Sequence, residues 1–565
     1  MLISNSLFEY ISTIGILLSF VGLIIGIVLD RKDISQVVKS AGFNKKDIVI
    51  GLAVVLIFIA VEIYLIKPTS LLFFDDAIYQ GMALDLIHTG QAWMCNYGTP
   101  LQCFSGQIFH EPVGLSFNIA IAFLILGVKR SSGYIAEMAL ASISVFMTFM
   151  VSMLLLKDRS SAIFSSMILA LTPVILVWAM PTNSDIAALA YSLIALFMLL
   201  VFIAKKNTLS LLNLFLSVSL LLYMKIDALI YIPIFAVAFI ILVDKNMKKS
   251  LRTTCTMLKS SLLDTKFLVA LLVFILLASP SVIFAFSNYS NDGFGYQGSQ
   301  VPLSCSSQIK FITATGSINF ENFKANICEN LAFWINAYKS SYVIQPIYFS
   351  ALAILGVGIM AWVGKRKELA VLVVWFGLLF FFYTAFYAGG VIFGVDWRFM
   401  ISLIAPVAIL GGFALGSVLG TATSYASKAF KFKSDFAHTV LYCLIGLVLI
   451  SSLFCTVCGE AKLLSINPSQ IQQAGDARFY ENFVYNQSGS IPTNCIVYTY
   501  DPTLFNINNR TATQLSNIYN ASFYANASSR YSCSVVDIGY WCYTPNNLCT
   551  NLNQYDFLII AHSIT

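Results

Sequence analysis

The chain has 565 residues, of which 58% are hydrophobic and 11% are charged, and its mean hydropathy is +0.80. Soluble domains carry roughly 25% charged residues, so this composition excludes an ordinary soluble protein and indicates a polytopic membrane protein. The net charge of +6 does not predict nucleic-acid binding, because in a membrane protein the position of each Lys and Arg matters more than their sum.

The first apolar run, Leu7 to Leu29, is interpreted as a retained membrane helix. Met1 to Tyr10 lacks the basic region of a signal peptide, and the charged residues 30 to 32 follow the run in place of a cleavage site. Runs of about 20 apolar residues, each long enough to cross a core of roughly 30 Å, recur along the chain. The twelve predicted spans are Leu7 to Leu29, Ile48 to Ile66, Tyr134 to Leu156, Ser161 to Ala179, Ser184 to Ile203, Leu209 to Tyr223, Leu229 to Val243, Phe267 to Phe286, Ile347 to Val363, Leu369 to Tyr387, Trp397 to Leu419 and His438 to Cys458.

A thirteenth apolar run, Val113 to Val128, is predicted to be an interfacial or re-entrant helix that does not cross. If it crossed, the basic linker 244–259 would face outward, against the positive-inside bias. Without that crossing the basic loops fall inside, Lys129 and Arg130 excepted, and both termini lie outside. The residues assigned to the inside are Arg31, Lys32, Lys39, Lys45, Lys46, Lys157, Arg159, Lys205, Lys206, the 244–259 linker, Lys365, Arg366, Lys367, Lys428, Lys431 and Lys433.

Glycosylation sites and cysteines agree with this orientation. Every Asn-x-Ser/Thr acceptor falls on the outer side, and these acceptors are Asn288, Asn486, Asn509, Asn520 and Asn526. Eight of the twelve cysteines also fall there, an even number in a compartment where disulfides form: Cys95, Cys103, Cys305, Cys328, Cys495, Cys533, Cys542 and Cys549. The sequence does not fix the pairing; Cys95 with Cys103 and Cys305 with Cys328 are preferred because each pair lies within one loop.

The polar stretch Leu71 to Pro112, in the first outer loop (67–133), holds the first candidate site. Asp75 and Asp76 follow two phenylalanines at a membrane exit, where a carboxylate can occupy a cleft and still reach water. Such a carboxylate could take a proton from an acceptor hydroxyl, as inverting glycosyl transfer requires. The alternative is that the two acids cap the helix that begins here.

The residues after the acidic pair supply a family resemblance. Ala77 to Trp93 (AIYQGMALDLIHTGQAW) has apolar residues at helical spacing and predicts a short helix that lies on the membrane surface and ends at Gly90. His110, Glu111 and Pro112 then lead into the next apolar run. This arrangement resembles the first outer loop of the GT-C glycosyltransferases, especially the protein O-mannosyltransferases and lipid A aminoarabinose transferases. Those enzymes carry an Asp-Glu pair, a helix ending in Thr-Gly and a Lys/His-Pro-Pro element.

The resemblance implies a GT-C helical bundle of about twelve spans with interfacial helices, in which the first acid of the pair is the catalytic base. That acid is Asp75, and Asp76 stands in place of the usual Glu. Glu111 stands where a Pro is common, so the base stays open between Asp75 and Asp76. His110 and Glu111 are predicted to contact substrate.

Two later outer segments also resemble the family. Asp185 takes the place of an acid that follows a Pro at the outer surface, and the alternative is helix capping by Asn183, Ser184 or Asp185. In Tyr387 to Pro406, Asp396 and Arg398 lie at the outer mouth of a membrane helix and are both predicted to contact substrate. Arg398 matches a residue that in relatives binds the phosphate of the lipid donor.

The planar guanidinium of Arg398 suits a phosphate, and an intramembrane Arg is a functional candidate by default. A surface pair of Asp396 with Arg398 is the alternative. Lys225, close to Asp227, occupies a position where relatives often have an Arg. Its ammonium could neutralise phosphate, and snorkelling explains it equally well.

No metal signature is evident, because the four histidines are scattered. A divalent cation held by Asp75, Asp185 and their neighbours is left open only by analogy with oligosaccharyltransferases of the same superfamily. The polar tail, 459–565, predicts a small extracytoplasmic α/β domain after the membrane module 1–458, which includes the outer loop 287–346.

Topology and resemblance together predict a glycosyltransferase at the outer membrane face. It would move a sugar, such as mannose, from a polyprenyl or dolichyl phosphate to a hydroxyl of a protein, glycan or lipid acceptor, with inversion. One alternative is a transporter or flippase of lipid-linked sugars, for which inverted repeats and helices broken at mid-membrane would be typical. Another is an oligosaccharyltransferase-like member, against which the tail's lack of a Trp-Trp-Asp-Tyr-Gly signature argues.

Overall fold

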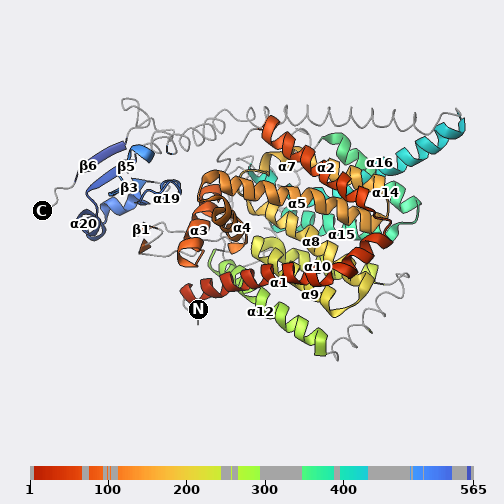
Figure 1. Cartoon of the computed structure of the whole chain (residues 1–565), viewed down its shortest axis with the longest axis horizontal. Coiled ribbons are helices and arrows are strands. Elements are labelled where there is room, and N and C mark those ends of the chain that lie inside the picture. Colours follow the sequence, from red (N-terminus) through yellow and green to blue (C-terminus); the bar gives the residue numbers. More distant parts are fainter. Residues whose placement is uncertain are drawn as a thin grey trace, which may run out of the picture.

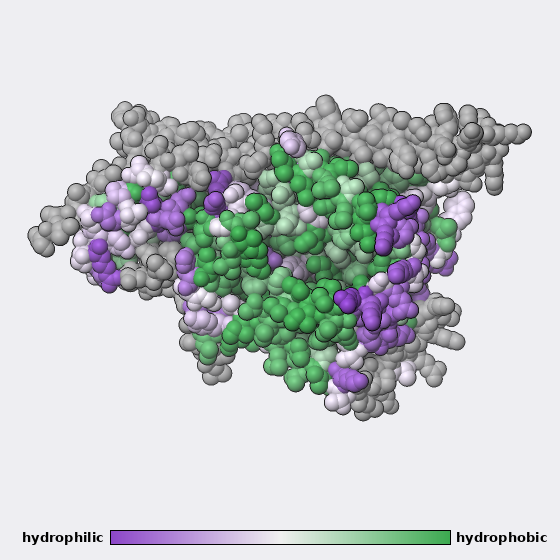
Figure 2. Space-filling model, in the orientation of Figure 1, coloured by the Kyte–Doolittle hydropathy of each residue, from purple (hydrophilic) through white to green (hydrophobic). Residues whose placement is uncertain are grey.

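The protein is a helical bundle with a small sheet beyond one end (Figure 1). The computed structural model describes residues 5–66, 75–92, 98–99, 102–103, 112–243, 256, 265–292, 346–386, 395–429, 484, 488–499, 502–537 and 557–561. Hydrophobic side chains cover the middle of the bundle on the face drawn in Figure 2, and hydrophilic residues gather at its two ends. This is the pattern of a bundle whose helices run across a membrane.

Among the described residues, seven helices are long and apolar enough to cross a membrane. They include α1 (Asn5–Ser40), α2 (Lys45–Val61) continued by η1 (Glu62–Ile66), α5 (Arg130–Leu156), α8 (Ser184–Lys205), α12 (Thr265–Asp292), α15 (Arg366–Phe386) and α16 (Ile401–Ala429). Shorter apolar helices are α4 (Val113–Leu126), α9 (Thr208–Met224), η2 (Ile226–Ile230) with α10 (Tyr231–Leu242), and α14 (Ile347–Trp362).

The predicted spans up to Trp397–Leu419 each coincide with one helix or with two consecutive helices, whereas His438–Cys458 lies outside the described residues. The span predicted from Ser161 to Ala179 consists of two helices. It is divided into α6 (Arg159–Ala170) and α7 (Pro173–Trp178), because Pro173 has no N–H to continue the helix and begins a new one.

Helix α4 is the thirteenth apolar run, and its placement agrees with a helix that does not cross. Its 14 residues extend about 21 Å, less than a hydrocarbon core of roughly 30 Å. The start of α2 lies beside the end of α5, where the rings of Phe43 and Phe149 are 5.6 Å apart. Because α2 leaves this end and α5 returns to it, the chain between them does not cross.

The basic loops predicted to share one side of the membrane meet at this same end of the bundle. Lys205 Nζ lies 2.9 Å from Asp33 Oδ1 and joins the ends of α8 and α1. Arg159 Nε lies 2.7 Å from Asp47 Oδ1 and joins the starts of α6 and α2. Lys365, before α15, donates a hydrogen bond to the last carbonyl of α5. We call this the basic end.

Close glycine contacts bring the backbones of neighbouring helices together. The first half of α16, residues 401–414, is buried, and the helix packs against α6 and α14. A Cβ at Gly356 of α14 would lie 2.1 Å from the carbonyl oxygen of Leu410 in α16, whereas a Cβ at Gly358 would meet nothing within 4 Å. The two glycines are matched in helix and position, and only one of them faces a neighbour.

We therefore expect Gly356→Ala to lower the free energy of unfolding by about 1–3 kcal/mol, because the added methyl must separate α14 from α16. The measurement is thermal unfolding in detergent. Gly358→Ala should be neutral or stabilising, since alanine is the better helix former. Equal effects of the two substitutions would contradict this account of the packing.

The described part of the tail forms a four-stranded sheet in the order β4-β3-β5-β6. Strand β3 (Cys495–Thr499) pairs in parallel with β4 (Ala512–Gln514) and β5 (Cys533–Asp537), and β6 (Phe557–Ala561) is antiparallel to β5. Helices α19 (Pro502–Ile507) and α20 (Ala521–Arg530) provide the crossovers that parallel pairing requires. Helix α19 packs against α3 (Asp75–Thr89) of the first outer loop and so attaches the sheet to the bundle.

A disulfide joins Cys495 to Cys533, which are also paired in register between β3 and β5. The sequence left the pairing of the tail cysteines open. The two preferred bridges, Cys95–Cys103 and Cys305–Cys328, lie outside what the structure describes, apart from the backbone of Cys103 in the short strand β2 (Gln102–Cys103) opposite β1 (Gly98–Thr99).

Candidate functional site

Asp185 lies in the first turn of α8, and its carboxylate is not used to cap that helix. Asn183 is the cap: its side-chain oxygen accepts from the backbone N–H groups of Asp185 and Ile186, at 3.1 and 3.3 Å. The amide of Asn183 in turn donates to two preceding carbonyls. Of the two interpretations of Asp185, capping by Asp185 itself is therefore wrong. Its carboxylate is fully buried and is directed to a neighbouring segment.

That neighbouring segment is the break between α9 and η2, which Lys225 occupies in an extended conformation. Lys225 Nζ lies 2.7 Å from Asp185 Oδ1 and 2.9 Å from Asp227 Oδ2. Burial alone would lower the pKa of the Lys225 ammonium, but the two carboxylates outweigh burial and raise that pKa above its ordinary value. Lys225 therefore stays charged, and because it is paired and only 11% exposed, it does not snorkel.

Arg398 joins the same group from η4 (Val395–Met400), which immediately precedes α16. Its Nε lies 3.6 Å from Asp185 Oδ2, and its side chain is 7% exposed. The alternative that Arg398 forms a surface pair with Asp396 does not hold, because Arg398 is buried. Asp396 precedes it by two residues in η4, and its side chain lies outside the description.

Aromatic side chains enclose the cations. Lys225 Nζ lies 4.3 Å from the ring centroid of Phe399, and the guanidinium carbon of Arg398 lies 5.4 Å from it. Tyr383, on α15, donates a hydrogen bond of 2.8 Å to Asp227 Oδ2. Tyr383 was not among the predicted site residues, because one tyrosine in a run rich in phenylalanine carries no signal of its own.

We call Asp185, Lys225, Asp227 and Arg398 the charge cluster. Two carboxylates face two cations, so the formal charges balance, as burial demands. The contacts of Asp185 are unequal, since Lys225 is at hydrogen-bonding distance and Arg398 is farther away. An arrangement of this kind can hold two cations in fixed positions and present them to an anionic ligand that reaches Arg398.

The charge cluster lies at the end of the bundle opposite the basic end. Helix α8 runs from Asp185 to the basic end, and α9 returns from there to Lys225. Helix α4 begins beside it, since a Cβ at Gly114 would lie 2.3 Å from the carbonyl oxygen of Tyr223. Because α3 packs on α4, the acidic pair's helix belongs to this same end.

Asp75 and Asp76 are the first two residues of α3, so a helix does begin at the acidic pair as predicted. Their side chains, like all of His110 and Glu111, lie outside the described parts. The helix ends as predicted at Gly90, which has φ +74°. Its position on the membrane surface stays a prediction, but the helix is packed against other elements and not exposed. Most of its side chains from Ile78 to Leu86 are buried, because α4 and α19 pack against it.

No group of three or more His, Cys, Asp or Glu side chains is placed to hold a metal ion among the residues that the structure describes. Asp185 and Asp227 share an ammonium between them. A divalent cation at Asp75 and Asp185 therefore stays a hypothesis that rests on analogy.

Residues 110–284 match the family model of the dolichyl-phosphate-mannose-protein mannosyltransferases. The predicted resemblance to the GT-C glycosyltransferases is thereby confirmed. The matched segment contains Asp185, Lys225 and Asp227, but it ends before Arg398 and begins after Asp75 and Asp76. No curated protein sequence matches the chain.

Among solved structures, the fold is similar to the oligosaccharyltransferase AglB of Archaeoglobus fulgidus, in complex with an inhibitory peptide and a dolichol-phosphate. The identity is 12% and the TM-score 0.49, over 87% of this chain and 70% of that one. It is also similar to ArnT of Cupriavidus metallidurans bound to undecaprenyl phosphate, with 12% identity and a TM-score of 0.47 over 93% and 99% of the two chains.

Proposed function

We propose that this protein is a membrane glycosyltransferase that moves a sugar from a polyprenyl or dolichyl phosphate to an acceptor hydroxyl with inversion. The observation that carries the proposal is the convergence of Lys225 and Arg398 on Asp185. Residues 110–284, which include Asp185 and Lys225, match a mannosyltransferase family model. The name of that family supports dolichyl phosphate mannose as the donor class.

The basic end supports the side of the membrane that we propose for the site. Lys and Arg residues are enriched in cytoplasmic loops, so the basic end is assigned to the cytoplasm and the charge cluster to the extracytoplasmic side. Nucleotide sugars belong to the cytoplasm, which favours a donor that the bilayer itself carries. Both termini are then extracytoplasmic, as is the tail that packs on α3.

In the proposed reaction, a bond forms on one face of the anomeric carbon of the donor sugar, and a bond breaks on the opposite face. The acceptor oxygen attacks the anomeric carbon while Asp75 or Asp76 takes its proton. The bond from that carbon to the phosphate oxygen breaks on the opposite face, and its electron pair stays with the phosphate. Arg398 and Lys225 stabilise the charge that develops on the phosphate. Asp185 and Asp227 hold these cations in place, and Tyr383 fixes Asp227.

The test is to incubate the purified protein in lipid nanodiscs with labelled dolichyl phosphate mannose and dolichyl phosphate glucose. We expect release of dolichyl phosphate, with the sugar transferred to an added acceptor or, slowly, to water. Movement of intact donor between leaflets of proteoliposomes without cleavage would support a flippase instead. A protein that neither cleaves nor moves these donors would contradict the proposed donor class.

A further inference from the structure

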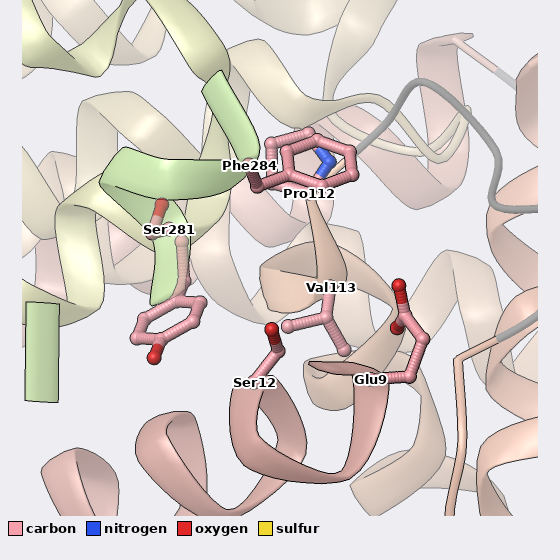
Figure 3. A pocket seen from close by; sticks show the side chains of 7 residues that line it. Glu9, Ser12, Pro112, Val113, Ser281 and Phe284 are labelled. Carbon is pink, nitrogen blue, oxygen red and sulfur yellow. The ribbon is translucent and has the colours of Figure 1, made fainter. Parts of the chain in front are cut away.

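A small pocket lies at the same end of the bundle, on the other side of the end of α9 from the charge cluster. Residues from α1, α9, α12 and the start of α4 line it (Figure 3): Glu9, Ser12, Pro112, Val113, Tyr223, Ser281 and Phe284. Tyr223 lies two residues before Lys225, a distance of about 7 Å or less along the chain. The pocket and the charge cluster are thus neighbours across one short segment.

Glu9 is the unusual residue in this pocket. It is only 5% exposed, and no hydrogen-bond donor or cation among the described residues reaches its carboxyl group. Its carboxyl group lines the pocket, so it is free to accept a hydrogen bond from a ligand that enters there. Figure 3 shows Glu9 and Ser12 rising from one turn of α1 toward Pro112 and Val113.

Two of the three hydroxyl groups that line the pocket are already engaged. Tyr223 donates to the carbonyl of Leu277 at 2.7 Å, and Ser281 donates to the carbonyl of Leu222. The carboxyl group of Glu9, with the hydroxyl of Ser12 on the same turn of α1, is left to select a ligand. A carboxyl group accepts hydrogen bonds from hydroxyls whether or not it is ionised. Pro112 and Phe284 add apolar walls, and the space that they leave suits a single small polar group such as a hydroxyl.

The pocket also borders helices that expose apolar side chains. Ile11 and Ile14 of α1 are 39% and 53% exposed, and Ile283 of α12 is 49% exposed. These are surfaces that lipid chains would cover, so a ligand carried by a membrane lipid could arrive between α1 and α12. A soluble ligand would not need apolar surfaces beside its binding pocket.

We propose that this pocket binds a hydroxyl group of the sugar on the lipid-linked donor, with Glu9 as the hydrogen-bond acceptor. The inference rests on the proposed function and deepens it. Glu9 and the charge cluster would recognise two different parts of one donor, the sugar and the phosphate. Recognition of the sugar would then depend on the first transmembrane helix.

The experiment measures binding of dolichyl phosphate mannose and of sugar-free dolichyl phosphate to the full chain in nanodiscs. Glu9→Ala should weaken binding of the sugar-bearing lipid about tenfold, the loss expected for a buried hydrogen bond of this kind. Binding of sugar-free dolichyl phosphate should change by less than about twofold. Glu9→Gln keeps an acceptor oxygen, so its loss should stay under about threefold. The control is Ser279→Ala, whose hydroxyl donates within α12 to Leu276 and does not line the pocket.

Unchanged binding of both lipids by Glu9→Ala would overturn the inference while leaving the proposed function intact. Equal losses for both lipids would mean that Glu9 supports the fold or the lipid site and not the sugar. A loss in Glu9→Gln as large as in Glu9→Ala would point to an ammonium or metal cation and would also overturn it. If the wild-type protein binds neither lipid, the proposed donor class itself fails.

Discussion

Replacing Arg398 with alanine is expected to reduce sugar transfer from a dolichyl phosphate donor by at least about 100-fold. Arg398 is buried beside Asp185 and Phe399 and is the cation less tightly held by the cluster's own carboxylates. If it stabilises the departing phosphate, its loss removes an interaction that is strongest in the transition state. The measurement is release of labelled sugar from dolichyl phosphate mannose under single-turnover conditions.

Two further variants make this result specific. Arg398→Lys retains the charge but not the planar fork, so it should recover part of the rate. Arg366→Ala removes an exposed arginine at the basic end and should keep full activity. Because removing Arg398 leaves Asp185 with Lys225 alone, the unfolding temperature of each variant must be compared with that of the wild type. Wild-type rates in a folded Arg398→Ala variant would remove Arg398 from the mechanism.

Replacing Asp75 with asparagine is expected to lower the rate of transfer by about 100-fold or more while leaving stability nearly unchanged. Asparagine is as good as aspartate at a helix start, so the variant separates the two interpretations of this residue. If Asp75 only begins α3, both the rate and the unfolding temperature should be preserved. If it is the general base, only the rate should fall.

Asp76→Asn is the matched variant, since Asp76 is the next residue of the same helical turn. One of the two substitutions is expected to abolish transfer while it changes donor binding by less than a few-fold. That substitution identifies the general base. If both single variants turn over at the wild-type rate, the acidic pair is structural and the base lies elsewhere. Loss of donor binding in both would assign the pair to substrate binding instead.

Local sequence signals determined much of the fold. Apolar runs located the membrane helices, because burial in lipid demands continuous hydrophobic segments. Asn183 and Gly90 mark a helix start and a helix end as capping chemistry requires. The helix break at Pro173 also has a local cause, because proline lacks the N–H that would continue the preceding helix. The span over these residues was predicted from hydropathy, which does not register such a break.

The sequence also identified Asp185, Lys225 and Arg398 as candidates, because charges in apolar surroundings are retained only where they are paired or used. It could not say which charges pair, since Asp185 and Arg398 lie on helices distant in the chain. Only the packing of α8, α9, α15 and η4 decided that Asp185 would hold Lys225, and that Tyr383 would hold Asp227.

The same distinction applies to Glu9. Its position near the start of the first apolar run was visible in the sequence, but its burial was not. The sequence by itself determined which residues are costly to bury. Tertiary structure decided where each of them lies and what it faces, because a buried charge is stabilised by groups within a few ångströms and those groups come from other helices.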